Sequence, residues 1–327
     1  MRVLVTGATG FTGGHLTRAL DAAGDHVRAL VHSPGSVVRI EGPGNIAIVH
    51  GDVRDPDAMR AAAEGVDVVY HTAAIYRQAG LRDAEYRAVN ATAVRTVIEA
   101  ARVGGARRVV HCSTVGVHGD VEHPPANEDA PLRPGDIYQQ TKLEGEQIAR
   151  EAGRNTGVEV VIVRPTGIFG PGDRRLLKLF RGVARRRFVI LGDGSIFYHL
   201  TYIDDLAEGF RLCGSVPAAA GNTYILAGGE VTTLNELTHL VAAEAQVPPP
   251  RLHLPVWPFW MAGAVCEVLC APFGIEPPIY RRRVDFFTKS RAFDITRARQ
   301  DLGYAPKVGL RDGIARTLQW YRQAGWI

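Results

Sequence analysis

The sequence contains little cysteine: four residues in 327, at positions 112, 213, 266 and 270. Their spacing matches no zinc-binding pattern, and each cysteine has apolar neighbours. We therefore expect no metal site. We also expect the cysteines to be reduced core residues of a cytoplasmic protein, without a disulfide.

Other features are missing as well. The chain enters an apolar segment directly after Met1 and Arg2, which leaves no room for a signal or transit peptide there. It has no basic stripe with interleaved aromatic residues, so no nucleic-acid partner is expected. The net charge is only +4, and the arginine triplets 185–187 and 281–283 are typical of solvated faces, although either could meet a phosphate.

Charge is scarce in one long segment, residues 254–273, whose only charged residue is Glu267. A segment of this length could span a bilayer. Prolines near both of its ends and the internal glutamate make it a poor membrane helix. We therefore predict that it forms core of the substrate region or an apolar substrate wall, without firm membrane association.

What the sequence does contain is a regular alternation of strand and helix patterns over its first 165 residues. Strands are expected at 2–5, 26–31, 46–50, 66–70, 107–112 and 158–163, and helices at 11–23, 56–64, 84–103 and 136–155. This alternation predicts an α/β fold with a doubly wound, Rossmann-type parallel sheet. The pattern loosens afterwards, with helices expected near 173–187, 204–213, 234–246 and 310–323 and strands near 198–203 and 223–226.

We accordingly divide the chain into a dinucleotide-binding part, residues 1–165, and a smaller, mixed and mainly substrate-binding part, residues 166–327. Some later segments are expected to return to the first part. The 46% hydrophobic and 22% charged content is ordinary for a water-exposed globular chain of this size.

A glycine-rich turn follows the first expected strand. Gly7, Gly10 and Gly13 have the spacing G-x-x-G-x-x-G, and the helix that follows opens at Phe11. Such a turn brings backbone N–H groups and a helix N-terminus close to a pyrophosphate. Together with Thr9, these residues form the predicted dinucleotide site.

The second expected strand ends without an acidic residue. An acidic side chain there would accept the ribose hydroxyls of NAD and repel a 2′-phosphate. The strand instead runs into His32 and Ser33, with Arg39 further on, and these side chains could donate to a phosphate. The sequence thus favours NADP over NAD, although His32 could also be an ordinary surface residue.

Later strand ends supply further candidates for the cofactor site. Asp52, followed by Val53, could meet the adenine amine or could be an ordinary turn aspartate. Ala73 and Ala74 are small enough to let a cofactor pass close to the backbone. Asn90 could be an ordinary helix residue or could brace the active-site helix through its amide.

The strongest catalytic candidate is the pair Tyr138 and Lys142. Their i, i+4 spacing places a phenol and an ammonium one turn apart on one helix face. A free tyrosine loses its proton near pH ~10, and a neighbouring cation lowers that pKa toward the range in which proton exchange with an alcohol or ketone is useful. Ser113 and Thr114 follow the fifth expected strand, and the long loop after them is expected to cover a site.

These motifs, taken in order, resemble the extended short-chain dehydrogenase/reductase superfamily over nearly the whole chain. The matching segments are the glycine turn 6–13, residues 51–53, 89–90 and 113–114, the Tyr138/Lys142 pair, Arg164-Pro165, residues 202–206, 293–299 and 302–306. The resemblance implies an NAD(P)-dependent enzyme and places Arg164 and Pro165 at the cofactor site. It also implies a homodimer formed through the helix near 84–103 and the Tyr138 helix.

The resemblance also implies roles for the catalytic residues. Tyr138 would be the acid/base that exchanges a proton with the substrate oxygen. Lys142 would lower the pKa of Tyr138 and hold the nicotinamide ribose. Thr114 would hydrogen-bond the substrate oxygen, and Ser113 could share or take that role.

The branch of the superfamily is indicated by departures from its sugar-nucleotide epimerases. These commonly carry Arg-Asp-Phe before the Tyr-x-Asp-Asp segment, where this chain has residues 197–201 without an arginine, and Thr166 and Ile168 stand where many have an asparagine. Arg174, Arg175 or the triplet 281–283 could still hold a diphosphate. The second strand resembles dihydroflavonol-reductase-like members, and residues 254–273 with Pro277 and Pro278 resemble 3β-hydroxysteroid-dehydrogenase-like members.

We therefore predict an NAD(P)-dependent oxidoreductase that interconverts a secondary alcohol and a ketone on a small-molecule substrate with an apolar part. The first alternative is an NAD-dependent nucleotide-sugar 4-epimerase or dehydratase. A second alternative, of a different class, is a cofactor-binding protein without turnover.

Overall fold

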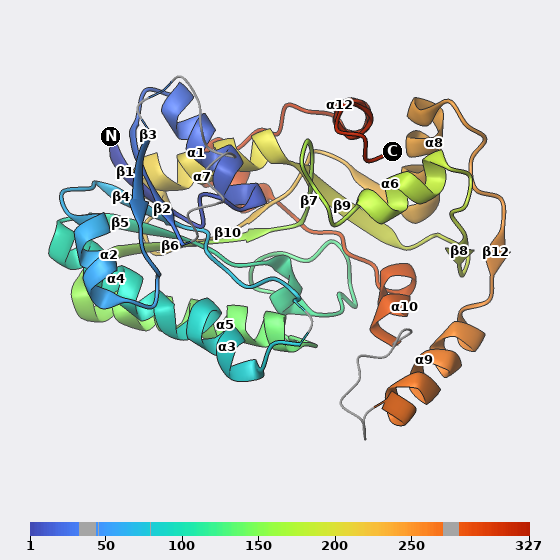
Figure 1. Ribbon diagram of the computed structural model, residues 1–327, viewed down its shortest axis with the longest axis horizontal. Helices are drawn as coiled ribbons and strands as arrows, with labels where there is room; N and C mark the ends of the chain where they lie inside the picture. The colour runs from blue at the N-terminus through green and yellow to red at the C-terminus, as the bar shows by residue number, and fades with distance from the viewer. Residues whose placement is uncertain (33–43, 45, 79, 271–280) are drawn as a thin grey trace.

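The computed structural model describes residues 1–32, 44, 46–78, 80–270 and 281–327 (Figure 1). The predictions for Ser33 and Arg39 lie outside the described residues. So do Pro277 and Pro278, and of the arginines at 281–283 only the backbone is described.

The first part of the chain is built on a seven-stranded sheet in which every pair of neighbours is parallel. Its strands are β1 (Arg2–Thr6), β2 (His26–Val31), β3 (Ile46–His50), β4 (Val68–His71), β5 (Arg108–Cys112), β6 (Glu159–Pro165) and β10 (Thr223–Leu226). The order β10-β6-β5-β4-β1-β2-β3 reverses direction between β1 and β4. This confirms the predicted doubly wound fold, in which ligands bind at the carboxyl edge near such a reversal.

Helices cover both faces of this sheet (Figure 1). On one side lie α1 (Phe11–Ala22) and α7 (Ile203–Ser215); on the other lie α2 (Pro56–Ala63), α4 (Ala93–Gly104) and α5 (Ile137–Thr156). Successive residues of β1 feed different cores: Val3 and Val5 pack toward α1 and α7, whereas Leu4 packs toward α2, α4 and α5. Strands buried on both faces explain the continuous apolar runs of the sequence.

The predicted helix at 84–103 is interrupted in its first half. It consists of α3 (Asp83–Arg87), a π-helical turn (Ala88–Thr92) and α4. The wider π turn includes Asn90 and turns this polar side chain into the protein interior.

The second part contains two small sheets and several helices. β7 (Gly167–Phe169) and β11 (Val231–Thr233) flank β9 (Phe197–Tyr202), parallel and antiparallel to it respectively, and β8 (Ile190–Leu191) pairs with β12 (His253–Leu254). The helices are α6 (Leu177–Ala184), α8 (Leu234–Ala245), α11 (Thr296–Leu302) and α12 (Leu310–Gln323). α6 begins later than predicted because the Asp173 carboxylate accepts hydrogen bonds from the backbone of Arg175 and Leu176 and forms a turn there.

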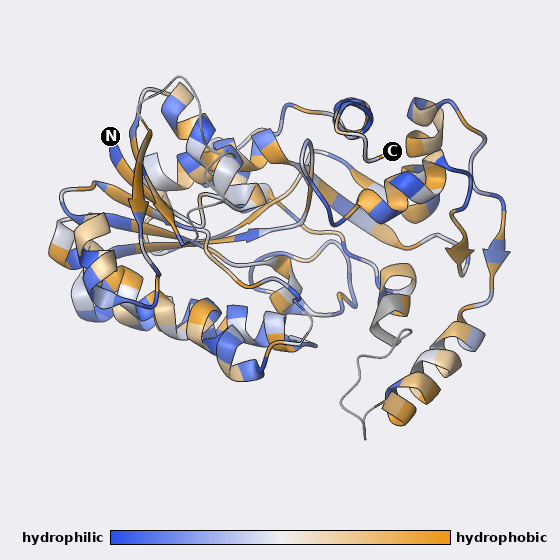
Figure 2. Ribbon diagram, viewed as in Figure 1, coloured by the Kyte–Doolittle hydropathy of each residue, from blue (hydrophilic) through white to orange (hydrophobic). Residues whose placement is uncertain are grey.

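The segment predicted to be apolar core has a different environment. Residues 256–270 form helix α9 (Val256–Cys270), which packs on α10 (Arg281–Thr288) along one face only. On its other face Trp257, Val268 and Leu269 are 69%, 72% and 63% exposed. Of the two predictions for this segment, core is therefore wrong, and the apolar substrate wall stays a prediction. Figure 2 shows α9 as an apolar helix at the margin of the molecule. Among the described helices, none has the length and apolar content needed to cross a membrane.

All four cysteines are free, as predicted. Their predicted burial is confirmed only for Cys213, on α7; Cys112 and the two cysteines of α9 are partly exposed.

Candidate active site

The glycine turn between β1 and α1 has the geometry of an anion cradle. Gly7 has φ +70°, and a Cβ there would lie 2.6 Å from the backbone nitrogen of Ala73; a Cβ on Gly13 would overlap the carbonyl of Gly7. These two glycines are required by the close packing of the loop itself. At Gly10 an added Cβ would lie 3.2 Å from the Gly7 carbonyl oxygen, which is tight but a smaller conflict than at Gly7 or Gly13.

The start of α1 carries no compensating side chain. No side-chain hydrogen bond caps the helix at Gly10, and its first turn, which begins at Phe11, contains no acidic residue. The backbone N–H groups of a first turn have no partner within the helix, and the helix dipole adds positive potential there. These observations fit the pyrophosphate of a dinucleotide cofactor.

At the carboxyl ends of β2 and β3, Asp52 lies in a turn and accepts hydrogen bonds from both the backbone and the guanidinium of Arg54, the latter at 2.5–3.0 Å. This hydrogen bonding lowers the pKa of Asp52. His32 Nδ1 lies 3.4 Å from the same carboxylate. Val53 is buried in the core beneath this turn. The sequence prediction missed Arg54, although its place two residues after a strand-end aspartate was a usable signal.

The end of β4 passes directly beneath the glycine turn. The Thr6 hydroxyl lies 3.4 Å from the backbone nitrogen of Ala73, so Ala73 and Ala74 begin the segment that faces the loop. The buried Asn90 amide then holds this segment, accepting from the Ile75 nitrogen at 2.8 Å and donating to the Ile75 carbonyl. It also donates to the Thr141 hydroxyl on α5. The Asn90 amide thus links the segment after β4 to α5, which is the bracing role that the sequence suggested. The amide oxygen and nitrogen both have partners within the protein.

Helix α5 presents the catalytic candidates. The helix starts where it does because the Asp136 side chain accepts a hydrogen bond from the Gln139 backbone at 2.8 Å. Tyr138 is half-buried, and Lys142, one turn further, is only 2% exposed. Thr114 lies beyond the end of β5, where its hydroxyl accepts from the Gly116 backbone at 3.1 Å and caps a short 3-10 turn.

The electrostatics around Tyr138 differ from the expectation. Burial raises the pKa of its phenol, and the groups that act in the opposite direction are the guanidiniums of Arg77 and Arg175. Burial also lowers the pKa of Lys142 itself. The tyrosine therefore holds its proton at neutral pH.

Two neighbours of Tyr138 were missed by the sequence prediction. The Tyr76 ring meets the Tyr138 ring edge to face, with centroids 5.0 Å apart. Arg77 has a positive φ of 30° and forms an ion pair with Asp136 at 3.2 Å. Both residues follow the small residues Ala73 and Ala74 within three positions, which was a signal that the loop faces the site.

Two predicted site residues, Ser113 and Arg164, belong to a buried network around Glu146. The Ser113 hydroxyl donates to Glu146 at 2.5 Å, and Arg164 makes a bidentate ion pair with Glu146 at 2.9 and 2.7 Å. Arg164 also donates to the Glu128 carbonyl. Both side chains are therefore engaged by Glu146, and the cofactor role of Arg164 and the shared catalytic role of Ser113 stay predictions. Pro165 is buried at the end of β6, beside β10.

Two fully buried histidines lie behind Lys142. His71 Nδ1 is 2.8 Å from the Thr6 hydroxyl, and the rings of His71 and His111 are 5.3 Å apart. Burial, with a smaller contribution from the Lys142 charge, lowers the pKa of His71 to about 3 and that of His111 well below its usual value. Both histidines are therefore neutral at physiological pH.

Arg174 and Arg175, which the sequence suggested as partners of a diphosphate, point to different parts of the structure. The Arg174 guanidinium lies 5.0 Å over the ring of Trp326 near the C-terminus, whereas that of Arg175 lies 5.1 Å over Phe11 at the glycine turn. His199, in the run that lacks the epimerase arginine, is buried and lies 2.8 Å from the Gly228 carbonyl. Of these side chains, Arg175 alone reaches the site.

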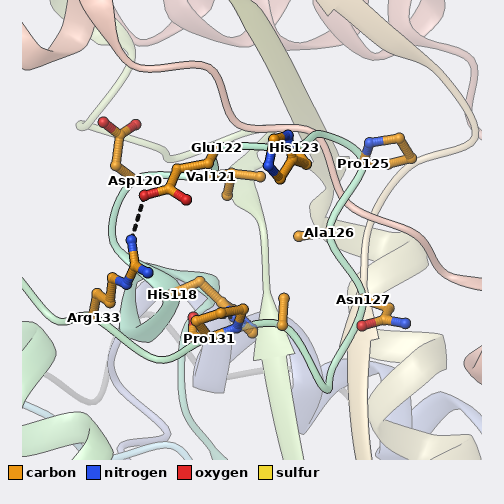
Figure 3. Close-up of a pocket in the computed structure, with 11 residues that line it drawn as sticks. His118, Asp120, Val121, Glu122, His123, Pro125, Ala126, Asn127, Pro131 and Arg133 are labelled. Carbon is orange, nitrogen blue, oxygen red and sulfur yellow. Dashed lines mark hydrogen bonds and ion pairs between the residues drawn. The ribbon is translucent and has the colours of Figure 1, made fainter.

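A hollow of about 260 Å³ lies within the long loop after β5 (Figure 3). Its lining comes entirely from residues 118–133, and Glu122 and Arg133 form an ion pair across it. Thr114, Tyr138 and Lys142 do not line it. The hollow is therefore separate from the candidate catalytic residues.

The known proteins that this chain resembles include a nicotinamide-dependent enzyme family, in agreement with the glycine turn and the sheet order. The model of the NAD dependent epimerase/dehydratase family matches residues 3–227. The 2-alkyl-3-oxoalkanoate reductase of Stenotrophomonas maltophilia is 32% identical, over 97% of this chain and 98% of that protein. A 3 beta-hydroxysteroid dehydrogenase/Delta 5-->4-isomerase of Mycobacterium tuberculosis is 30% identical, over 98% of this chain and 90% of that protein.

Solved structures also match over the full length. The crystal structure of gox2253 superposes with a TM-score of 0.84 at 29% identity and covers 100% of this chain and 99% of that chain. The dTDP-glucose 4,6-dehydratase DesIV from Streptomyces venezuelae, with NAD and TYD bound, has a TM-score of 0.78 at 27% identity and covers 100% of this chain and 98% of that chain.

Proposed function

This chain belongs to the NAD-dependent epimerase/dehydratase family, and on that premise we propose that it interconverts a secondary alcohol and a ketone on an apolar substrate. It is an enzyme of the extended short-chain dehydrogenase/reductase type. The observation that carries the proposal is the placement of Thr114 just after β5 and of Tyr138 and Lys142 on α5. Tyr138 is linked to Phe11 at the glycine turn through Tyr76 and Arg175. Relatives named as an oxoalkanoate reductase and a hydroxysteroid dehydrogenase support the reaction class.

The residues divide the chemistry between them. A bound nicotinamide supplies or accepts the hydride. In the reductive direction the substrate carbon gains that hydride, the electron pair of the C=O π bond passes to oxygen, and Tyr138 donates the proton that completes the hydroxyl. Thr114 hydrogen-bonds the same oxygen and orients it. The raised pKa of Tyr138 suits this direction, because the phenol remains protonated until the oxygen becomes basic.

The direct test is Tyr138→Phe. We expect a loss of roughly 10²- to 10⁴-fold in kcat, the usual contribution of a general acid. The dissociation constant for the nicotinamide cofactor should not change. Tyr224→Phe, on the distant strand β10, is a matched control that should keep wild-type turnover. Wild-type activity in Tyr138→Phe would contradict the mechanism.

We further propose NADP rather than NAD as the preferred cofactor. The support is the set of cationic or neutral donors at the ends of β2 and β3, where His32 and Arg54 surround the single carboxylate of Asp52. The ribose 2′-phosphate would find a positive partner in the exposed Arg54. Titration with NADPH and NADH should give tighter binding of NADPH, and Arg54→Gln should reduce that difference. A strong preference of the wild type for NADH would contradict this assignment.

A nucleotide-sugar epimerase or dehydratase is the second candidate. The similarity to DesIV and the position of Arg175 beside the glycine turn support it. The run 197–201, in which those enzymes commonly have an arginine and this chain has none, counts against it. Interconversion of UDP-sugars by protein with tightly held NAD, without net NADH production, would favour this candidate over the first.

A homodimer formed through α4 and α5 and a cytoplasmic location complete the proposal. The support is the family resemblance and the exposed outer surfaces of these two helices, which carry paired charges such as Arg95 and Glu151. Sedimentation equilibrium tests the dimer: a monomer at micromolar concentration would contradict it.

A further inference from the structure

Two arginines from distant parts of the chain meet beside the catalytic tyrosine. The guanidinium carbon of Arg77 is 5.4 Å from the ring centre of Tyr76 and 6.0 Å from that of Tyr138. The guanidinium carbon of Arg175, from the segment between β7 and α6, is 6.0 Å from the same Tyr76 ring. Two like charges near one half-exposed ring repel each other, so an anion beside this ring would be stabilised by both.

Each arginine is held in place by one aspartate that also binds the backbone. Asp136 pairs with Arg77 at 3.2 Å and caps α5 through Gln139. Asp173 is buried, pairs with Arg175 at 2.9 Å and accepts from the backbone of Leu176. These carboxylates therefore orient the guanidiniums and are themselves shared with helix and turn N–H groups. Both arginine side chains remain about one third exposed.

The backbone at Arg77 adds a separate observation. Its φ of 30° lies in a region that side-chain-bearing residues rarely adopt, so the backbone there is strained. Strained residues of this kind cluster at ligand-binding sites. Here the strain directs a guanidinium toward the Tyr138 ring, and both guanidiniums act to lower the pKa of that phenol.

We propose that Arg77 and Arg175 bind the carboxylate of a 3-oxo or 3-hydroxy acid whose C3 oxygen meets Tyr138. In such an acid a single carbon separates the carboxylate from the reacting carbon. A substrate that places its C3 oxygen on Tyr138 must therefore place its carboxylate in the immediate surroundings of that phenol, where the two guanidiniums lie. The planar fork of arginine suits a carboxylate. The inference rests on the proposed function and names its substrate class.

The experiment compares an acid with its uncharged ester in the oxidative direction, in which the substrates are chemically stable. The probes are 2-butyl-3-hydroxyoctanoate and its methyl ester, with NAD⁺ or NADP⁺ as oxidant, and kcat/KM is measured for each. The wild type should prefer the acid. Arg77→Gln and Arg175→Gln should each lose roughly ten- to a hundredfold on the acid, as expected for the loss of a charge-assisted hydrogen bond. Turnover of the ester should change much less.

Two further variants sharpen the comparison. Arg77→Lys restores the charge without the fork and should recover part of the preference for the acid. Arg82→Gln, which removes a highly exposed arginine at the start of α3, should leave both substrates unaffected. The cofactor dissociation constant should stay at the wild-type value in every variant.

Several results would overturn the inference. An equal loss on acid and ester would assign the arginines a structural role, and a weakened cofactor affinity would assign Arg175, which lies near Phe11, to the pyrophosphate. Equal turnover of acid and ester by the wild type would show that the enzyme does not recognise a substrate carboxylate. If Tyr138→Phe abolishes turnover of both probes while the arginine variants discriminate neither, the proposed function stands and this inference alone fails. If the wild type oxidises neither probe, both fail.

Discussion

Among single residues, Glu146 holds the side chains of Ser113 and Arg164 through hydrogen bonds. It lies on α5 one turn after Lys142 and takes hydrogen bonds from Ser113 on one side and Arg164 on the other. The three side chains are almost fully buried. They tie α5 to β5 and β6, and this holds the helix that carries Tyr138 against the carboxyl edge of the sheet.

Glu146→Gln should destabilise the protein strongly. It leaves the Arg164 guanidinium buried without its countercharge, and breaking a buried pair in this way costs about 3–5 kcal/mol. Urea unfolding measures the free energy of unfolding. The control is Glu122→Gln, whose exposed pair with Arg133 should contribute no more than about 1 kcal/mol. A similar small change in both variants would show that the Glu146 network is not structural.

His71 should make the protein sensitive to acid. In the unfolded chain a histidine takes up a proton near pH ~6.5, whereas burial lowers the pKa of folded His71 to about 3. The unfolded state therefore binds the proton first. The free energy of unfolding is therefore unaffected by His71 above about pH 6.5. Below that it falls progressively as the pH drops toward 3, by roughly 2 kcal/mol at about pH 5.

The measurement is the difference in unfolding free energy between about pH 7 and about pH 5, for wild type and for His71→Gln. The variant lacks this titration, so its stability should fall less on acidification, whatever its absolute value. His111, which faces the same Lys142 charge, should still contribute. Parallel pH dependence in the two proteins would show that His71 is protonated in the folded state as well.

At the scale of structural elements, the glycine turn combines two requirements that the sequence motif does not separate. Gly7 and Gly13 are needed by the loop itself, because a side chain at either would collide with backbone atoms. At Gly10 an added Cβ would meet only the Gly7 carbonyl oxygen, at 3.2 Å, so the conflict there is smaller. Spacing identifies all three glycines, and only the packing assigns the first two to folding.

Gly10→Ala should therefore mainly weaken cofactor binding, whereas Gly13→Ala should mainly lower the stability of the fold. Gly10→Ala should still fold, with a stability loss of about 1–2 kcal/mol, because its Cβ would lie 3.2 Å from the Gly7 carbonyl oxygen and only a small shift would relieve the contact. It should bind the nicotinamide cofactor at least about tenfold more weakly, since the methyl group stands where a pyrophosphate would approach. Gly13→Ala should lose several kcal/mol of stability. Cofactor titration and urea unfolding measure the two effects; normal cofactor affinity in Gly10→Ala would contradict the cradle.

Helix α9 makes a prediction about stability at the same scale. Trp257→Gln with Val268→Gln should change the unfolding free energy by no more than about 0.5 kcal/mol, because these side chains are already mostly exposed. A matched core control is Leu237→Ala on α8, which removes a fully buried side chain and should cost about 2–5 kcal/mol. A large loss in the α9 variant would mean that the apolar face is covered by another surface in solution.

At the scale of the whole molecule, the two parts of the chain share one framework. Strand β10, although late in the sequence, pairs with β6 in the main sheet. The Glu128 side chain accepts from the Ile225 backbone, and Asp205 on α7 accepts from the backbone of Lys307 and Val308. The β10–β6 pairing and the Glu128–Ile225 hydrogen bond both cross residue 165, so we expect the two parts to unfold as one unit.

Thermal or urea unfolding should therefore show one cooperative transition. All four tryptophans lie after residue 250, so their fluorescence reports the second part, whereas far-UV circular dichroism reports the whole chain. Coincident curves are expected because neither part keeps its sheet and covering helices without the other. Two separated transitions would show that residues 166–327 unfold as an independent domain.

The sequence by itself determined the features that depend on neighbouring residues. Alternating strand and helix patterns predicted the parallel sheet, because periodicity records which face of each element is buried. The spacing of the glycines, and the i, i+4 spacing of Tyr138 and Lys142 in a helix capped by Asp136, are equally local. The last helix, 310–323, was predicted with its observed boundaries for the same reason.

Tertiary structure alone decided which side chains are consumed by internal partners and which are free to act. Ser113 and Arg164 carry the same motif signal as Thr114, yet Glu146 takes both. Tyr76, Arg77 and Arg175 carry no motif, yet the fold assembles them at the phenol. An apolar segment becomes core only where another surface covers it, and one face of α9 lacks such a cover among the described residues. Partner choice is a long-range property, because it depends on which elements the sheet order brings together.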